Sequence, residues 1–167
     1  KTDEMFVLTG AESVDGIDRN GDTDAVDFVV TLRDRRNGEI YTLGAPFGYA
    51  PDGSPLPTCG IPGSPESRAV FTLLQQGFEL PAIAFERDVA AFLENEAAEN
   101  QCDENGDGDR ADAILRVFSL SLGELTFTVS PPRAVDPTPL VDGQPIAISN
   151  GRVFFRTSEA SSGAHET

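Results

Sequence analysis

The sequence predicts an all-β fold built from antiparallel repeat units. The 16 glycines and 12 prolines occur every few positions along the 167 residues, a distribution typical of short strands joined by turns. Hydrophobic residues make up 39% of the chain, which is enough for the core of one domain, and they include 11 Phe but no Trp. The third observation is an internal repeat of strand, acidic loop and strand. We therefore expect residues 1–167 to form a single all-β domain.

Two acidic segments are copies of one unit. A gap-free shift of 85 positions superposes DRNGDTDAVD, residues 18–27, on DENGDGDRAD, residues 103–112. The match extends backward to Leu8 over Leu93. Self-similarity at a fixed spacing indicates copies of one supersecondary unit.

A weaker match relates the second copy to a third, partial one. A shift of 63 positions places IAFERDVAAFLENEA at 83–97 over IAISNGRVFFRTSEA at 146–160. The two shifts differ because a segment rich in Pro and Gly interrupts the chain after the first copy, and we expect that segment to be an irregular loop. The expected organisation is unit 1 at about 1–44, an inserted loop at 45–66, unit 2 at about 67–130 and a partial unit 3 at about 140–167.

Each unit is expected to hold about four antiparallel strands, with the acidic loop in the middle. Asn150–Gly151 in PIAISNGRVFFRT and Asn37–Gly38 in DFVVTLRDRRNGEIYTLG are turn dipeptides between β-rich arms. Alanine and glutamate within residues 82–94 could also support a helix. The alignment with the strand-like third copy favours strands there.

The acidic loops favour calcium. Four carboxylates within ten residues repel one another at a cost that grows as water is excluded, so a folded loop needs a cation or full exposure. Calcium takes about six to eight oxygen ligands, and side chains at alternate loop positions can wrap around it, whereas magnesium demands strict octahedral geometry. Gly21 and Gly106 supply the positive φ that such a curl needs. We expect two calcium ions, held by Asp18, Asn20, Asp22, Asp24 and Asp27 in the first loop and by Asp103, Asn105, Asp107, Asp109 and Asp112 in the second.

Asn, Asp and Gly also form good turns without any metal. That interpretation is disfavoured because both copies keep every acidic position while most other positions differ. An EF-hand is excluded because it requires a bidentate acid at loop position 12, where this chain has Val29 and Ile114.

The loops resemble the strand-to-strand calcium loops of FG-GAP and integrin-alpha-like β-propeller repeats, whose pattern DxNGDGxxD is followed by an apolar strand. The resemblance covers roughly residues 5–44 and 82–128, and the last aspartate, Asp27 or Asp112, falls one position later than in that pattern. It implies four-stranded, β-propeller-blade-like units rigidified by calcium in extracellular adhesion or surface proteins. A closed propeller needs about 4–8 blades, so two or three units leave a β-sandwich as the alternative arrangement.

The charge balance favours cations as partners. With 28 acidic and 12 basic residues, the chain would repel nucleic acid and anionic membranes, and no apolar run approaches the roughly 18 residues of a membrane span. Cys59 and Cys102 lie outside any CxxC motif, and we expect them to form one disulfide in an oxidising compartment, the alternative being two free buried thiols. These features predict an extracellular or cell-surface location.

The sequence contains no recognisable catalytic motif, and its only histidine, His165, lies near the end of the chain. We therefore expect a secreted structural module that binds calcium, is not an enzyme, and forms part of a surface or filamentous assembly. Its expected partners are copies of itself or neighbouring repeats, because an open repeat joins head to tail. Two alternatives are an adhesion or ligand-binding module that uses the loop 46–65, and an accessory domain of a secreted hydrolase.

Overall fold

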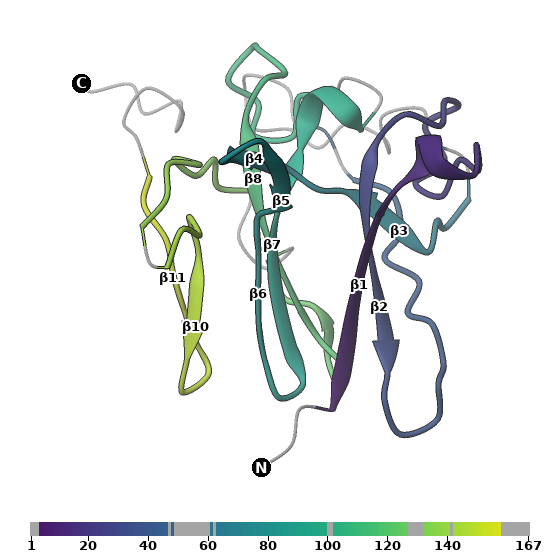
Figure 1. Ribbon diagram of the computed structural model, residues 1–167, viewed down its shortest axis with the longest axis vertical. Coiled ribbons are helices and arrows are strands. Elements are labelled where there is room, and N and C mark those ends of the chain that lie inside the picture. Colours follow the sequence, from purple (N-terminus) through teal and green to yellow (C-terminus); the bar gives the residue numbers. More distant parts are fainter. Residues whose placement is uncertain are drawn as a thin grey trace.

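The computed structural model describes residues 4–46, 48, 61, 63–99, 102–126, 132–140 and 142–157. Within these ranges the regular structure consists of antiparallel strands and two three-residue 3-10 turns, so the predicted all-β class is confirmed. A sheet of β1–β3, a sheet of β6–β9 and the β10–β11 hairpin follow one another across the molecule (Figure 1). No helix in this part of the chain is long and apolar enough to cross a membrane.

The first sheet has the strand order β1-β2-β3. β1 (Met5–Ala11) and β2 (Phe28–Asp34) pair antiparallel with Met5 opposite Asp34, and β3 (Ser67–Ala69) pairs with the other side of β2. Both long strands are rich in aliphatic, aromatic and β-branched residues, which pack well on a pleated surface. The first acidic loop connects β1 to β2.

The second sheet has the strand order β6-β7-β8-β9. Its strands are β6 (Ile83–Glu86), β7 (Val89–Asn95), β8 (Ala113–Ser119) and β9 (Gly123–Glu124). The strands predicted over 82–94 are therefore confirmed, despite the alanines and glutamates in that stretch. They form because both faces of β7 are covered by other layers, so burial outweighs the helical propensity of these residues.

Two hairpins complete the described strands. β4 (Thr72–Gln75) pairs with β5 (Phe78–Pro81), and β10 (Ala147–Ser149) pairs with β11 (Arg152–Phe154). The second hairpin turns through Asn150–Gly151, whose φ angles of 52° and 70° are the positive values that a tight two-residue hairpin turn requires.

The turn at Asn37–Gly38 differs from the expected hairpin. Gly38 has a φ of 78° and donates its N–H to the Asp34 carbonyl at 2.9 Å, but the returning arm forms only an isolated bridge between Arg33 and Ile40. The first sheet therefore has three strands, whereas the second has the expected four.

Two hydrophobic cores lie on opposite faces of the middle sheet. The first contains Met5, Val30 and Leu32 of the first sheet and Ala90, Phe92 and Phe118 of the second; the rings of Phe92 and Phe118 stack with centroids 5.7 Å apart. The second core lies on the other side of β7 and β8 and includes residues from the β10–β11 hairpin. Burying each large apolar side chain contributes about 1.5–3 kcal/mol, so these two layers hold the sheets in place.

The strand registers correct the gap-free alignment of the two copies. Met5 pairs with Asp34, and Val89 pairs with Ser119. The strand before the acidic loop is therefore displaced by 84 positions (89 minus 5) and the strand after it by 85 (119 minus 34). The second loop contains one extra residue, so Leu8 corresponds to Phe92 and not to Leu93. In a strand, a shift of one residue moves a side chain to the opposite face of the sheet. The corrected alignment therefore changes which side chains of the first strand lie on the same face in both copies.

Candidate metal centres

Each acidic loop leaves the end of one strand and returns to the start of the next. It opens with a 3-10 turn, η1 (Glu12–Val14) in the first loop and η2 (Glu96–Ala98) in the second. In the first loop Glu12 N–H donates to the Asp27 carbonyl at 2.8 Å, and in the second Glu96 N–H donates to the Asp112 carbonyl at 3.3 Å. These bonds close both loops at the same place.

The first aspartate of each loop holds the curl of the backbone. Asp18 accepts the N–H of Gly21 at 2.6 Å on one carboxylate oxygen and the N–H of Thr23 at 3.0 Å on the other. Asp103 does the same with Gly106 at 2.7 Å and Gly108 at 3.1 Å. Three further side chains in each loop accept the N–H two residues ahead: Asn20, Asp22 and Asp24 in the first, and Asn105, Asp107 and Asp109 in the second.

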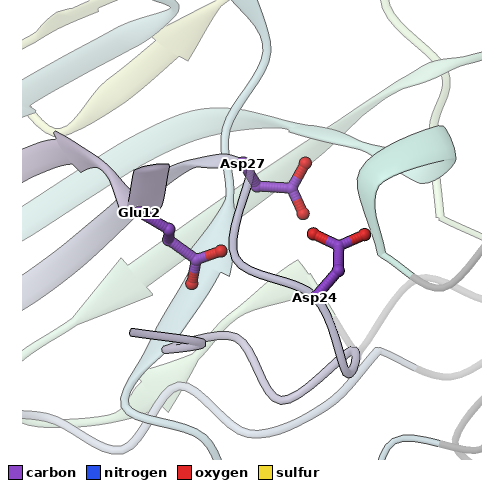
Figure 2. Close-up of side chains that lie close together, drawn as sticks. All are labelled: Glu12, Asp24 and Asp27. Carbon is purple, nitrogen blue, oxygen red and sulfur yellow. The ribbon is translucent and has the colours of Figure 1, made fainter. Parts of the chain in front are cut away.

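The two loops build equivalent groups of three carboxylates. Glu12, Asp24 and Asp27 each offer an oxygen, and these oxygens all lie within 4.8 Å of one another (Figure 2). Glu96, Asp109 and Asp112 form the corresponding group in the second loop, with the same limit of 4.8 Å. We call these groups triad 1 and triad 2. Either triad could hold a metal ion.

Glu12 is the buried member of triad 1. One of its oxygens accepts the backbone N–H groups of Arg19 and, at 3.4 Å, Asn20. Its other oxygen is buried and has no hydrogen-bond partner among the described residues. A buried polar atom without a partner is costly, and a cation at the triad would supply the missing interaction.

Glu96 is buried in the same way in triad 2. One of its oxygens accepts the Glu104 N–H at 2.7 Å and the other accepts the Asp112 N–H at 3.0 Å. Glu104 occupies the loop position of Arg19, so the same carboxylate-to-backbone bond positions the glutamate in both copies.

The loop asparagines position the aspartates that close the triads. Asn20 donates its side-chain amide to Asp27 at 3.3 Å and to the carbonyl of Ala98 at 3.2 Å. Asn105 donates to Asp112 at 2.7 Å. The bond to Ala98 also ties the first acidic loop to η2 of the second.

Burial and mutual repulsion raise the pKa values of the clustered carboxyl groups. Burial, followed by the charges of Asp22 and Asp24, raises the pKa of Asp27 to about 7. Burial, followed by the charge of Asp107, raises the pKa of Asp112 to about 6, although the Asn105 hydrogen bond opposes this shift. The carboxyl groups thus resist ionisation together, as expected of an acidic cluster that lacks a countercharge.

The two glutamates follow the same trend. Burial raises the pKa of Glu96 to about 8, and the charges of Asp112 and Asp103 act in the same direction. Burial also raises the pKa of Glu12, with a further contribution from the charge of Asp18. A cation bound at either triad would favour the ionised forms.

The predicted ligand positions have three roles, and four of them lie outside the triads and accept the N–H two residues ahead: Asn20, Asp22, Asn105 and Asp107. Asp24 and Asp27, with Asp109 and Asp112, join the triads, while Asp18 and Asp103 accept backbone N–H groups on both of their oxygens. Glu12 and Glu96 were not among the predicted ligands, because the gap-free shift places Glu12 over Ala97. A one-residue gap aligns the two glutamates at the end of the preceding strand, and that signal would have identified them.

The second loop contains two further buried glutamates that anchor it to the sheets. Glu104 pairs with the guanidinium of Arg116, and Glu99 accepts the N–H of Ala69 at the end of β3. Burial, followed by the charge of Glu94, raises the pKa of Glu99 well above its usual range. The loop is thereby bonded to β8 of its own sheet and to β3 of the first sheet.

Several predicted features fall outside the described residues. Cys102 is buried, but its predicted partner, Cys59, lies outside them, so the disulfide stays a prediction. Most of the loop 46–65 and His165 also lie outside them.

Comparison of the chain with known family models, curated proteins and solved structures gives no match. The resemblance to FG-GAP repeats therefore rests on the loop pattern alone. The chemistry of the two triads carries the functional conclusion.

Proposed function

We propose that the protein is a calcium-binding structural module in which each acidic loop holds one calcium ion between two strands. The observation that carries this proposal is the buried Glu12 carboxylate, whose unpartnered oxygen belongs to the same cluster as Asp24 and Asp27. The second triad supports it, because a loop of different sequence again brings a buried glutamate together with two aspartates, although both oxygens of Glu96 also accept backbone N–H groups.

The donor set favours calcium over other ions. The triads contain only carboxylates, which are hard oxygen ligands, and neither includes the thiolate or imidazole groups that zinc prefers. Calcium–oxygen bonds are about 2.3–2.6 Å long, so two ligands of one ion can be at most about 5 Å apart. The 4.8 Å limit of the triads is compatible with that span. Magnesium has shorter bonds and a stricter octahedral geometry.

The proposed role of the ions is structural. An ion at either triad would bridge the end of one strand, the acidic loop and the residue before the next strand, and would stabilise only the folded arrangement. At a hundredfold excess over Kd this linkage is worth about 2.7 kcal/mol per site. Extracellular calcium modules bind in the range of about 10⁻⁴–10⁻³ M, which suits a secreted or cell-surface protein. Blade-like units of an extracellular surface assembly remain the setting that the FG-GAP resemblance implies.

Calorimetric titration of the full chain with calcium tests this proposal. We expect two ions per chain in the wild type, one in Glu12→Gln and one in Glu96→Gln, because each substitution removes a buried charged ligand from one triad. Glu79→Gln, an exposed glutamate on β5, is the matched control and should bind two ions. Absence of calcium binding in the wild type, or two bound ions in both triad variants, would show that the triads are not calcium sites.

A further inference from the structure

The three strand groups pack in one repeating order. For each group we define a front face and a back face from the alternation of side chains along its strands. The front face of unit 1 comprises Phe6, Leu8, Gly10, Val29, Thr31 and Arg33. The strand registers show that the corresponding residues of unit 2 are, in the same order, Ala90, Phe92, Glu94, Ile114, Arg116 and Phe118. The back faces contain the intervening residues.

The front face of unit 2 packs on the back face of unit 1. Phe92 and Phe118 of the former contact the core that contains Val30 and Leu32 of the latter. All four side chains are buried.

The β10–β11 hairpin repeats this relation with unit 2. The hairpin corresponds to β6 and β7 of unit 2. A shift of 63 positions places the paired residues Glu86 and Val89 on the paired residues Ser149 and Arg152. Val153 and Phe155, its front-face residues, pack against the core that contains Leu115 on the back face of unit 2. Front face on back face is thus the packing rule at both internal junctions.

On β1, the front face of unit 1 has no such cover among the described residues, whereas Val29 on β2 and its pairing partner Ala69 on β3 are buried. Leu8 is 48% exposed and Phe6 is 46% exposed, whereas their counterparts Phe92 and Ala90 are both fully buried at 0%. Leu8 also lines an open groove of about 800 Å³ together with Ile17 and Ile40. A large exposed apolar surface on a folded protein marks an interaction site.

The other end of the stack carries the complementary face. Phe154 lies on the back face of the hairpin and is 48% exposed, beside its pairing partner Ala147. It corresponds to Ala91 on the back face of unit 2, which is buried in the core against which the hairpin packs. Within the described part of the chain, the β1 side of the front face of unit 1 and the back face of β10–β11 are therefore both exposed.

We propose that the front face of unit 1 binds the back face of the β10–β11 hairpin of a second copy of this chain. The contact continues the packing rule of the two internal junctions, and because its two surfaces differ it is a head-to-tail contact that propagates along a filament or closes a ring. This inference goes beyond calcium binding and does not require it.

The front face of unit 1 differs in charge from the front face of unit 2. In unit 2 this face holds Glu94 and Arg116, and Glu94 receives Arg68 from β3 of the first sheet. In unit 1 the corresponding positions are Gly10 and Thr31, which offer no charged partner. Arg33 is charged on the same face and Arg152 lies on the back face of the hairpin, so the apolar part of the contact is formed by Phe6, Leu8 and Phe154.

Sedimentation velocity over a concentration series, in calcium, tests the contact. We expect the wild type to form progressively larger oligomers, and Leu8→Asp and Phe154→Asp each to remain monomeric, because each variant lacks one of the two faces. An equimolar mixture of the two variants should form a heterodimer and nothing larger, because each variant retains the face that the other lacks. Leu74→Asp, which places the same charge at a leucine that is 76% exposed on β4, is the matched control and should assemble like the wild type.

Three results would overturn the proposal. A wild type that stays monomeric at every concentration excludes the contact without the use of any variant. Dimers of Phe154→Asp alone would show a symmetric front-to-front contact, and assembly of Leu8→Asp would show that the front face is not used. Far-ultraviolet circular dichroism checks that each variant is folded, and Ile40→Asp on the same groove replaces Leu8→Asp if that variant does not fold.

Discussion

Thr23 and Gly108 occupy equivalent positions in the two acidic loops and share an unusual backbone conformation. Their φ angles are 87° and 99°, a region that glycine adopts freely and β-branched residues adopt at a cost. Thr23 keeps this conformation because its N–H is held by Asp18, just as Gly108 is held by Asp103. The first loop therefore carries strain that the second does not.

Replacing Thr23 by glycine should stabilise the protein. Strained positive-φ residues cost on the order of 1–3 kcal/mol, part of which is offset by the greater freedom of glycine in the unfolded chain. We expect Thr23→Gly to gain about 1 kcal/mol, or roughly 2–4 °C in Tm for a domain of this size. Differential scanning calorimetry in calcium measures the change. The reciprocal variant Gly108→Thr should lose a similar amount, and a destabilised Thr23→Gly would contradict the prediction.

Strands β3, β7 and β8 are joined by a network of buried ion pairs. Glu94 on β7 accepts the guanidinium of Arg68 from β3 on one oxygen and that of Arg116 from β8 on the other. Arg116 also pairs with Glu124 at 3.2 Å and with Glu104 of the second acidic loop. Because Arg68 comes from the first sheet and Glu94 from the second, the network fixes how the two sheets meet.

Removing the central glutamate should destabilise the protein strongly. Glu94→Ala would leave two buried guanidinium groups without their shared carboxylate, and breaking a buried ion pair typically costs about 3–5 kcal/mol. Urea unfolding of the variant and the wild type gives the difference. The exposed Glu79→Ala should change the free energy of unfolding by less than about 0.5 kcal/mol. A loss below about 1 kcal/mol in Glu94→Ala would mean that the network does not hold the sheets together.

The stability of the entire protein should depend on pH in the absence of calcium. Asp27, Asp112 and Glu96 have folded-state pKa values raised to about 7, about 6 and about 8, while in the unfolded chain they ionise near pH 4. Between about pH 4 and pH 8 the folded state therefore binds more protons than the unfolded state. Stability is fully present below this range and is lost as the pH rises through it.

Thermal unfolding with a chelator and with calcium measures this effect. We expect the Tm of the chelated protein to fall as the pH rises from about 5 to about 8, and the increase in Tm on adding calcium to be larger at the upper pH, where protons no longer compete for the carboxylates. Asp27→Asn together with Asp112→Asn should reduce the pH dependence, and the contribution of Glu96 should remain. A chelated protein whose Tm rises over this range would rule out the proposed repulsion.

Much of the local structure could be predicted from the sequence because its causes are local. Asn150–Gly151 makes a hairpin turn through its own backbone preferences, and the spacing of Asp18, Gly21 and Thr23 suffices to curl the acidic loop. The strand-like third copy likewise identified β6 and β7. The turn and the curl of the loop depend on neighbouring residues, whereas β6 and β7 also depend on burial between the two cores.

The tertiary structure alone decided which distant residues meet. Glu12 reaches Asp24 and Asp27 because β1 ends beside the start of β2, and Glu94 reaches Arg68 because two sheets pack face to face. Both outcomes depend on strand register, and a one-residue insertion in the second loop changes which face a side chain occupies without altering the composition of the chain. The all-β class, the turns and the acidic loops therefore follow from the amino-acid sequence. The partners of the buried glutamates and the open faces of the stack were decided by pairing between separate elements, whose registers depend on the packing of the complete fold.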